Sequence, residues 1–283
     1  MNLKWGSCTK SSIEEYVSKP ETGWSHISID ESIIEIFSKN INTFNCDCLI
    51  ICFSAAVPSR ENKKPPFFSG LKISDTLNYP LIAISDPSLA MNEKVSLGWY
   101  AGNSNQPNFQ KVIRKFIDSI TEVVTGKVIV IGGSGGGFAG LATNFFDEPS
   151  KFNTIVWNPQ VSITDYYSSF VERYTKFCWN FSSSNYPLDV ISKFNELGII
   201  HDLRNHEFKT EAKIVYLQNI SDSSHYQKHC MSFVSALSME EKDNEGYINI
   251  FKKNHLEVKI GNWGQGHVSP SDEILSKEIR NML

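Results

Sequence analysis

The sequence of 283 residues predicts an α/β protein in which helices cover a central, mostly parallel sheet. Short apolar runs alternate along the chain with longer amphipathic stretches, the pattern of strands joined through helices. The short runs are nearly continuous in Ile, Val and Leu, which is typical of strands buried on both faces. The predicted strands are Leu49–Phe53, Leu81–Ile84, Val128–Ile131, Thr154–Trp157, Ile214–Leu217 and Leu256–Ile260.

The amphipathic stretches between these runs are predicted helices. In the clearest, Phe109–Val124, apolar residues recur three and four positions apart and therefore share one helical face. Further helices are predicted over Phe138–Phe146, Gln227–Leu237 and Asp272–Met282. Ser271 is the predicted N-cap of the last one. Weaker runs at Ile27–Ile29 and Ile33–Ile36 favour an antiparallel start to the sheet.

Residues from about 160 to 212 depart from this alternation. They are rich in Tyr, Phe and Ser, are broken at Pro187, and contain helical stretches but no strong strand. We expect one domain over residues 1–283, with this segment inserted between two strands as a cap. The polar stretch from Ser59 to Pro66 is predicted to be a mobile loop.

The composition excludes several classes of protein. Hydrophobic residues are 41% and charged residues 20%, which is ordinary globular usage. The net charge of −4 argues against a basic face for nucleic acid or anionic membrane. No apolar run approaches the roughly 18 residues of a membrane span, and Met1–Ser7 lacks the core of a signal peptide. No CxxC pair occurs, so we expect a reduced, cytoplasmic protein in which Cys46 and Cys48 act as small hydrophobic residues.

One motif indicates a chemistry. The strand that ends at Ile131 leads into Gly132-Gly133-Ser134-Gly135-Gly136, followed by a predicted helix. This matches the GxSxG nucleophile elbow, in which a serine lies on a strained turn between strand and helix. Neighbouring glycines are needed because side chains there would collide. The Gly135 N–H is then a predicted oxyanion-hole donor at the start of the helix.

The same glycines allow a second interpretation. Gly135, Gly137 and Gly140 also fit the GxGxxG fingerprint of dinucleotide-binding proteins. That motif requires its first glycine directly after the strand and an acidic residue at the end of the next strand. Here the next strand is followed by Asn158 and Pro159, so we keep a nucleotide-dependent oxidoreductase only as a weaker alternative.

A serine nucleophile needs a base, and chain order selects it. In elbow enzymes the order is serine, acid, histidine. His267 follows the last predicted strand in a glycine-containing loop, where such a base belongs. His26 precedes the elbow, whereas His201, His206 and His255 lie in polar stretches typical of a solvated surface.

The acid that orients the base should follow the penultimate predicted strand. Asp222 is the only carboxylate in that turn, although a simple N-cap is the other explanation for it. Asp202 is the fallback. His225 and His229 lie four residues apart beside Asp222, but no third ligand is in view, so we predict no metal. They are expected to orient Asp222 or to form part of the pocket wall, with a polar helix start as the alternative.

Small residues follow the strand Leu49–Phe53, so backbone N–H groups there can approach a ligand. Ala55 is therefore the predicted second oxyanion donor. Asp86 and the pair Trp99-Tyr100 are candidates to line the acyl or acceptor pocket, with a turn and a core position as equally good explanations.

Ser134, Asp222 and His267, in that order, make the chain resemble an α/β-hydrolase-fold serine enzyme from about Leu49 onward. The segments Gly132–Gly140, Trp157–Gln160, Asn219–Tyr226 and Gly264–Pro270 are similar to small bacterial hydrolase-fold proteins of capsule and surface-glycan synthesis. Some of these are O-acetyltransferases. The resemblance implies acyl transfer to or from a carbohydrate.

We therefore expect a serine enzyme that forms an acyl-enzyme and transfers an O-acetyl group to a capsular or surface polysaccharide. Hydrolysis of a small or glycan ester is the first alternative. A non-catalytic glycan-binding or secretion-accessory protein on the same scaffold is the second, because fold does not fix function. No permanently bound cofactor is expected, acetyl-CoA is a candidate acyl donor, and a homo-oligomer is left open.

Overall fold

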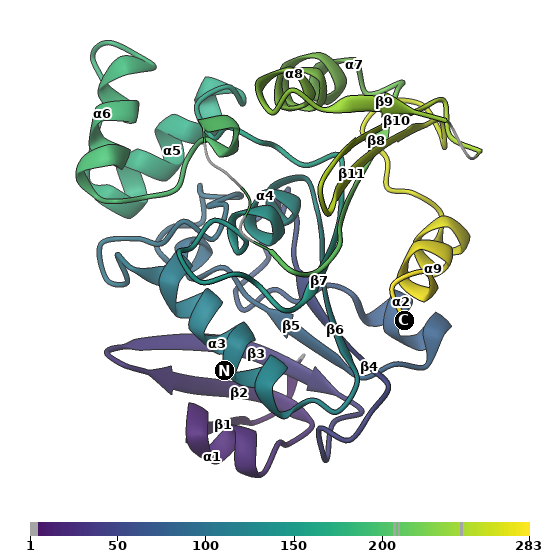
Figure 1. The fold of residues 1–283 in the computed structure, drawn as a ribbon. Coiled ribbons are helices and arrows are strands. Elements are labelled where there is room, and N and C mark those ends of the chain that lie inside the picture. The colour runs from purple at the N-terminus through teal and green to yellow at the C-terminus, as the bar shows by residue number, and fades with distance from the viewer. Residues whose placement is uncertain (1–4, 206–207, 209, 244–245) are drawn as a thin grey trace.

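The computed structural model describes residues 5–205, 208, 210–243 and 246–283. Within them eleven strands form one sheet in the order β1-β2-β3-β5-β4-β6-β7-β8-β11-β10-β9 (Figure 1). The strands are β1 (Cys8–Ser12), β2 (Gly23–Ile29), β3 (Ser32–Lys39), β4 (Cys48–Phe53), β5 (Leu81–Ile84), β6 (Lys127–Gly133), β7 (Asn153–Trp157), β8 (Ile214–Asn219), β9 (Glu240–Lys242), β10 (Asn249–Lys253) and β11 (Leu256–Gly261). The α-helices are α1 (Ile13–Ser18), α2 (Leu71–Leu77), α3 (Phe109–Val123), α4 (Ser134–Ala142), α5 (Ser168–Trp179), α6 (Leu188–Glu196), α7 (Ser223–His225), α8 (Ser232–Ala236) and α9 (Asp272–Arg280).

The centre of the sheet is parallel, as predicted. Strands β5, β4, β6, β7, β8 and β11 are neighbours that all run in one direction. Both margins contain antiparallel pairs: β2 with β3, β3 with β5, and the β9–β10–β11 set. The predicted antiparallel start is therefore confirmed, and the fold class is α/β with a mostly parallel sheet.

Helices cover both faces of this sheet, which explains why its central strands are largely apolar. In β4 all six residues are buried, and alternate side chains point to opposite faces. Leu49 and Ile51 pack in one hydrophobic cluster with α1 and α3. Ile50 packs in another with α2 and α9. All six predicted buried strands are present in the structure.

Three strands, helices α1 and α2 and several helix boundaries differ from the sequence prediction. Strands β1, β9 and β10 were not expected, because they are short or polar and lie at or beside the sheet edges. Helix α4 (Ser134–Ala142) begins four residues before the predicted start and ends four residues before the predicted end. The helix expected over residues 227–237 begins as a π-helical turn at Tyr226–Met231 and continues as α8.

The aromatic segment between β7 and β8 contains α5 and α6 in the part that the structure describes. These helices share one hydrophobic cluster with α4 and with the loop before α3. Val171, Tyr174 and Phe194 pack there with Trp99 and Phe138. The insertion thus packs against α4 through buried aromatic side chains. The division into one domain with a cap stays a prediction.

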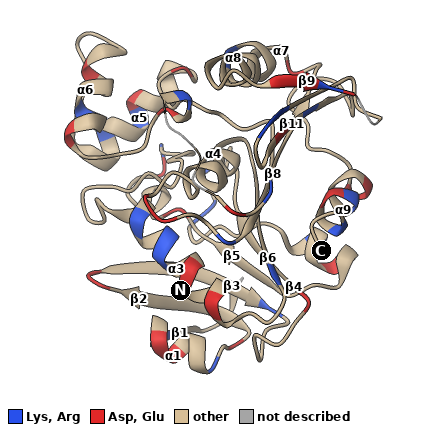
Figure 2. Ribbon diagram, viewed as in Figure 1, with Lys and Arg blue, Asp and Glu red and all other residues tan. Residues whose placement is uncertain are grey.

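Charged residues of both signs are mixed over the surface. Figure 2 shows Asp and Glu interleaved with Lys and Arg along α9, in agreement with the small net charge of −4. Among the residues that the structure describes, no helix combines the length and the apolar character needed to cross a membrane.

Candidate active site

The candidate site lies at the carboxyl ends of four neighbouring parallel strands. Ser134 follows β6, Gln160 follows β7, Asp222 follows β8 and His267 follows β11. Because these strands are adjacent and parallel, their following loops meet at one edge of the sheet. Residues 133 positions apart in sequence, from 134 to 267, are thereby collected beside one another.

Ser134 occupies the turn between strand and helix that the sequence motif predicts. Strand β6 ends at Gly133 and α4 begins at Ser134, with no residue between them. Ser134 has φ +54°, in the left-handed region, which costs an L-residue about 1–2 kcal/mol. The residue is only 5% exposed, so the strain holds a nearly buried hydroxyl in a fixed place.

Close neighbours explain the run of glycines around this serine. A Cβ atom on Gly133 would lie 2.1 Å from the indole nitrogen of Trp157. On Gly136 it would lie 2.6 Å from the carbonyl oxygen of Phe53, and on Gly137 it would lie 2.8 Å from the Cβ of Pro159. The end of β4 and the residues at and just after the end of β7 therefore pack directly against the turn at Ser134, where side chains on these glycines would clash.

Asp222 and His267 are in direct contact. Asp222 Oδ2 lies 2.5 Å from His267 Nδ1. Burial alone would raise the pKa of Asp222, but hydrogen bonds from His225 and His267 outweigh burial and lower it below its usual range. The Asp222 carboxylate also accepts the backbone N–H of His225 at 3.4 Å, as the N-cap of α7. Asp222 is thus both the carboxylate that contacts His267 and a helix N-cap, the two explanations that the sequence allowed.

The loop that carries His267 is fastened to β7 and β8. The side-chain amide of Asn219 donates to the carbonyls of Gly264 and Gly266, at 2.8 Å each. The amide of Asn158 donates to the carbonyl of Val268 at 2.7 Å. Gly264 and Gly266 both have positive φ, which lets the loop turn His267 back over the sheet edge.

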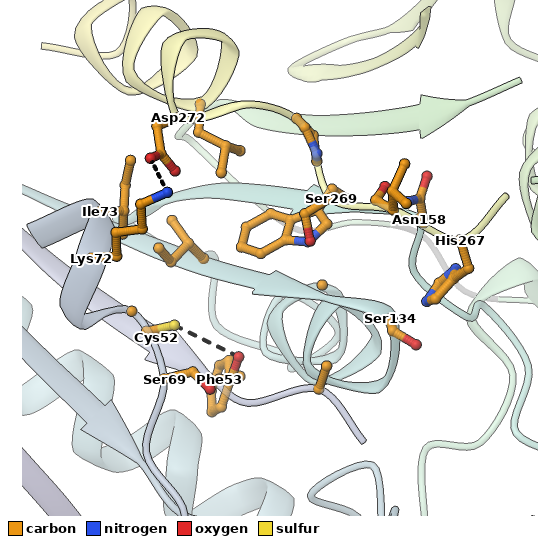
Figure 3. Close-up of a pocket in the computed structure, with 18 residues that line it drawn as sticks. Cys52, Phe53, Ser69, Lys72, Ile73, Ser134, Asn158, His267, Ser269 and Asp272 are labelled. Carbon is orange, nitrogen blue, oxygen red and sulfur yellow. Dashed lines mark hydrogen bonds and ion pairs between the residues drawn. The ribbon is translucent and has the colours of Figure 1, made fainter. Parts of the chain in front are cut away.

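Ser134 and His267 face one pocket of about 370 Å³ (Figure 3). The pocket extends from these two side chains toward α2 and α9. Ala55 lines it, as expected of the loop after β4, while Gly135 is buried in the first turn of α4. The N-cap residue of α4 is Gly133, which has no side chain. The first N–H groups of α4 are therefore not capped by an N-cap side chain. The other residues that line the pocket are Cys52, Phe53, Ser69, Gly70, Lys72, Ile73, Ile131, Gly133, Trp157, Asn158, Val268, Ser269, Pro270, Asp272 and Leu275.

A second histidine also contacts the acid. His225 Nδ1 lies 3.0 Å from Asp222 Oδ2, and its ring stacks on that of His267 with centroids 4.2 Å apart. Burial lowers the pKa of His225, and the nearby His267 lowers it further, against the opposing effect of Asp222. His229 accepts the backbone N–H of Val161 at 3.3 Å, and burial lowers its pKa to about 3. His225 thus contacts Asp222, as one expected role requires. Neither histidine is among the residues that line the pocket described above, and His229 instead bonds the backbone of the insertion.

Gln160 is a site residue that the sequence analysis did not find. Its Nε2 lies 2.9 Å from Ser134 Oγ and 2.8 Å from His225 Nε2. A glutamine has no place in the usual serine, acid and base scheme. Its position directly after β7, beside the elbow strand, is the signal that could have found it.

Three ligand-type side chains converge here. Donor atoms of Asp222, His225 and His267 lie within 4.8 Å of one another, so they could hold a cation. In the structure both histidines contact the Asp222 carboxylate and their rings stack on each other. Gly135, Gly137 and Gly140, which also fit the dinucleotide fingerprint, all lie buried inside α4 rather than in a turn facing solvent.

The remaining candidates lie elsewhere. Asp202, the fallback acid, pairs with Arg204 at 2.6 Å. Trp99 and Tyr100 are buried in the core, where Asp86 accepts the backbone N–H of Tyr100 at 3.0 Å. Of the other histidines, His26 pairs with Glu35, His201 bonds Asn195, His255 is exposed, and His206 lies outside the described residues.

No protein-family model matches the chain, and no curated protein matches its sequence. Solved structures do match its fold. One is the capsule O-acetyltransferase of Neisseria meningitidis serogroup A, at 14% identity and a TM-score of 0.59, covering 93% of this chain and 96% of that one. A mutant of that transferase was solved in complex with CoA.

Two further matches extend the comparison to other enzymes of this fold. The acetyl xylan esterase of Paenibacillus sp. R4 is 12% identical, with a TM-score of 0.54 over 89% of this chain and 80% of the esterase. Dipeptidyl peptidase 4 of Porphyromonas gingivalis is 10% identical, with a TM-score of 0.59 over 92% of this chain and 35% of the peptidase. The fold is therefore that of the α/β-hydrolases, as the resemblance implied.

Proposed function

We propose that this chain is a serine acyl-transfer enzyme. Ser134 Oγ attacks the acyl carbonyl, His267 takes the serine proton, and Asp222 holds the imidazole and stabilises its positive charge. The observation that carries the proposal is the 2.5 Å contact between Asp222 and His267 beside a serine held at positive φ.

Two backbone groups are proposed to bind the oxygen that becomes negative during attack. One is the Gly135 N–H in the uncapped first turn of α4, and the other is the Ala55 N–H in the loop after β4. Tyr100 supports this loop, because its hydroxyl accepts the preceding Ser54 N–H at 2.7 Å. A donor of this kind lowers the barrier by about 3 kcal/mol.

The acyl group is proposed to be small and its acceptor to be a carbohydrate hydroxyl, as in O-acetylation of a capsular or surface polysaccharide. The pocket beyond Ser134 is mainly apolar, which is compatible with the methyl group of an acetyl ester. Tyr166, Tyr167 and Phe170 form an aromatic cluster next to His225, and Tyr167 is 53% exposed. Exposed aromatic rings stack well on sugars. Acetyl-CoA is the proposed donor, used as a substrate.

Ester hydrolysis is the second candidate function, and one observation favours it. The His267 side chain is 42% exposed, so a water molecule can reach His267, which would then act as the base that activates this water. Incubating the enzyme with an acetyl donor, with and without a glycan, separates the two. Transfer adds an acetyl group to the glycan, whereas hydrolysis releases acetate at the same rate without it.

The proposal is tested by the intact mass of the protein after treatment with a fluorophosphonate. Attack by Ser134 forms an oxygen–phosphorus bond and expels fluoride, leaving one adduct. We expect a single adduct on the wild type and none on Ser134→Ala, with both proteins melting at similar temperatures. A folded wild type that takes no adduct would contradict the proposal of an activated serine and favour a binding protein.

A further inference from the structure

We infer that Asp222 orients the nucleophile as well as the base, through His225 and Gln160. This inference rests on the proposed role of Ser134. His225 and Gln160 form a second path from the carboxylate to the serine: Asp222 to His225 at 3.0 Å, His225 to Gln160 at 2.8 Å, and Gln160 to Ser134 at 2.9 Å. The path does not pass through His267.

The direction of each hydrogen bond follows from the first one. An ionised carboxylate only accepts, so His225 Nδ1 must carry its proton and donate to Asp222. In a neutral imidazole the other nitrogen, Nε2, is then an acceptor. Gln160 must therefore present its NH₂ group, and not its oxygen, to His225.

The orientation of the Gln160 amide determines which hydrogen bonds the Ser134 hydroxyl makes. The NH₂ group of Gln160 has two hydrogens, one for His225 Nε2 and one for Ser134 Oγ. Ser134 Oγ then accepts from Gln160, which leaves the hydroxyl proton free to point at His267. With the amide reversed, Gln160 Oε1 would compete with His267 for that proton.

This orientation of the Gln160 amide has an energetic cost, which lies at its side-chain oxygen. Gln160 is fully buried, and its Oε1 has no hydrogen-bond partner among the residues that the structure describes. A buried amide oxygen without a partner is unfavourable, so something must hold the amide in place. The acceptor nitrogen of His225, itself only 3% exposed and stacked on His267, supplies that constraint.

Gln160 is accordingly a catalytic residue, because it touches the reacting oxygen, and His225 is a positioning residue. Two substitutions of His225 separate its two bonds. His225→Asn keeps a donor near Nδ1 for Asp222 but loses the acceptor at Nε2. His225→Gln places an amide oxygen near Nε2 to accept from Gln160 but loses the donor to Asp222.

The experiment measures the second-order rate of fluorophosphonate labelling, together with kcat and KM for a small acetyl ester. Gln160→Met and His225→Asn are each expected to lower the labelling rate and kcat about tenfold, with KM nearly unchanged, the loss expected for one hydrogen bond. His225→Gln is expected to stay within about twofold of the wild type, because its amide oxygen accepts from Gln160 without needing Asp222 to fix a tautomer. Because His225 acts through Gln160, the double variant His225→Asn/Gln160→Met should be no slower than Gln160→Met alone.

Gln110→Met is the matched control. Gln110 also makes two hydrogen bonds, both to the backbone of Ile200 at 2.9 Å, but on α3 away from Ser134. It should lower the melting temperature without changing the labelling rate.

Labelling of His225→Asn at the wild-type rate, an equal loss in His225→Gln, or additive losses in the double variant would each overturn the inference while leaving the proposed function intact. A wild type that takes no label would contradict both the inference and the proposed function.

Discussion

Two histidines share the carboxylate of Asp222, and this determines what a change at that residue should do. In Asp222→Asn the new amide can donate to His267 Nδ1, which leaves the proton on Nε2, where it cannot receive another from Ser134. We expect kcat to fall by about 10⁴-fold while the protein stays folded. Steady-state kinetics on an ester substrate measure this loss.

Asp202→Asn is the matched control for that substitution. Its carboxylate bonds Arg204 rather than a histidine, so its turnover should equal that of the wild type. A near-normal rate in Asp222→Asn, together with a large loss in Asp202→Asn, would transfer the role of the acid to Asp202.

His229 gives a prediction about stability and pH. It is 1% exposed and its pKa is lowered to about 3, whereas an unfolded histidine titrates near 6.5. Between about pH 6.5 and 3 the unfolded chain therefore binds one more proton at this residue than the folded chain. The free energy of unfolding falls with falling pH by up to about 1.4 kcal/mol per pH unit from this group alone.

His229→Asn should make that pH dependence shallower, because Asn Oδ1 can still accept the Val161 N–H but does not titrate. Urea unfolding at pH 7, 6 and 5 measures the slope. His255→Asn, at an exposed histidine, should leave the slope as it is in the wild type. Equal slopes in the wild type and His229→Asn would contradict a buried neutral imidazole.

Individual site residues could be nominated from sequence where strand order constrains them. Ser134, Asp222 and His267 each follow a predicted parallel strand, so their loops had to meet at one sheet edge. Gln160 obeys the same rule but was not singled out, because no reaction scheme calls for a glutamine there. The pairing of His225 with Gln160 depends on side-chain rotamers, which sequence spacing does not give.

At the level of elements, the end of β4 and the first turn of α4 lie in close backbone contact. Gly136→Ala would bring a methyl group within 2.6 Å of the Phe53 carbonyl and 2.8 Å of the Ser54 carbonyl. Neither backbone group can move without shifting the loop that carries Ala55. We expect a large loss of fluorophosphonate labelling, with destabilisation in the range of 1–3 kcal/mol typical of overpacking.

Gly135→Ala is the comparison that isolates this effect. Its new methyl group would meet the terminal methyl of Leu97 at 2.2 Å, and the end of a flexible side chain can turn aside. Its melting temperature should therefore fall less than that of Gly136→Ala. The reverse order would show that the end of β4 tolerates movement.

Element boundaries were predictable where local preference and tertiary packing agree. Helix α3 was found to within one residue because its apolar face is regular. Helix α4 starts four residues before the predicted boundary, since three consecutive glycines disfavour a helix and only packing under β4 and β7 makes them helical. Strand β9, Glu240–Lys242, is exposed at every position and has no apolar signal to read.

For the whole molecule, the sheet predicts a gradient of stability from its centre to its margins. Strands β4, β6 and β7 are buried and paired on both sides, whereas β1 and β9 lie at the two ends of the strand order. Amide hydrogen exchange should be slowest in β4, β6 and β7, with protection close to the free energy of global unfolding. The amides of β9 should exchange fastest among the strands, and comparable protection in β9 and β6 would contradict this order.

The collection of the site from the ends of β6, β7, β8 and β11 also has a consequence for protein synthesis. A ribosome adds Ser134 first and must add 133 more residues, from 134 to 267, before the partner base exists. Even then β11 must dock beside β8 before His267 meets Asp222. Under the proposed function, a growing chain therefore carries a serine without its base, and that serine can become an active nucleophile only after the last central strand has docked.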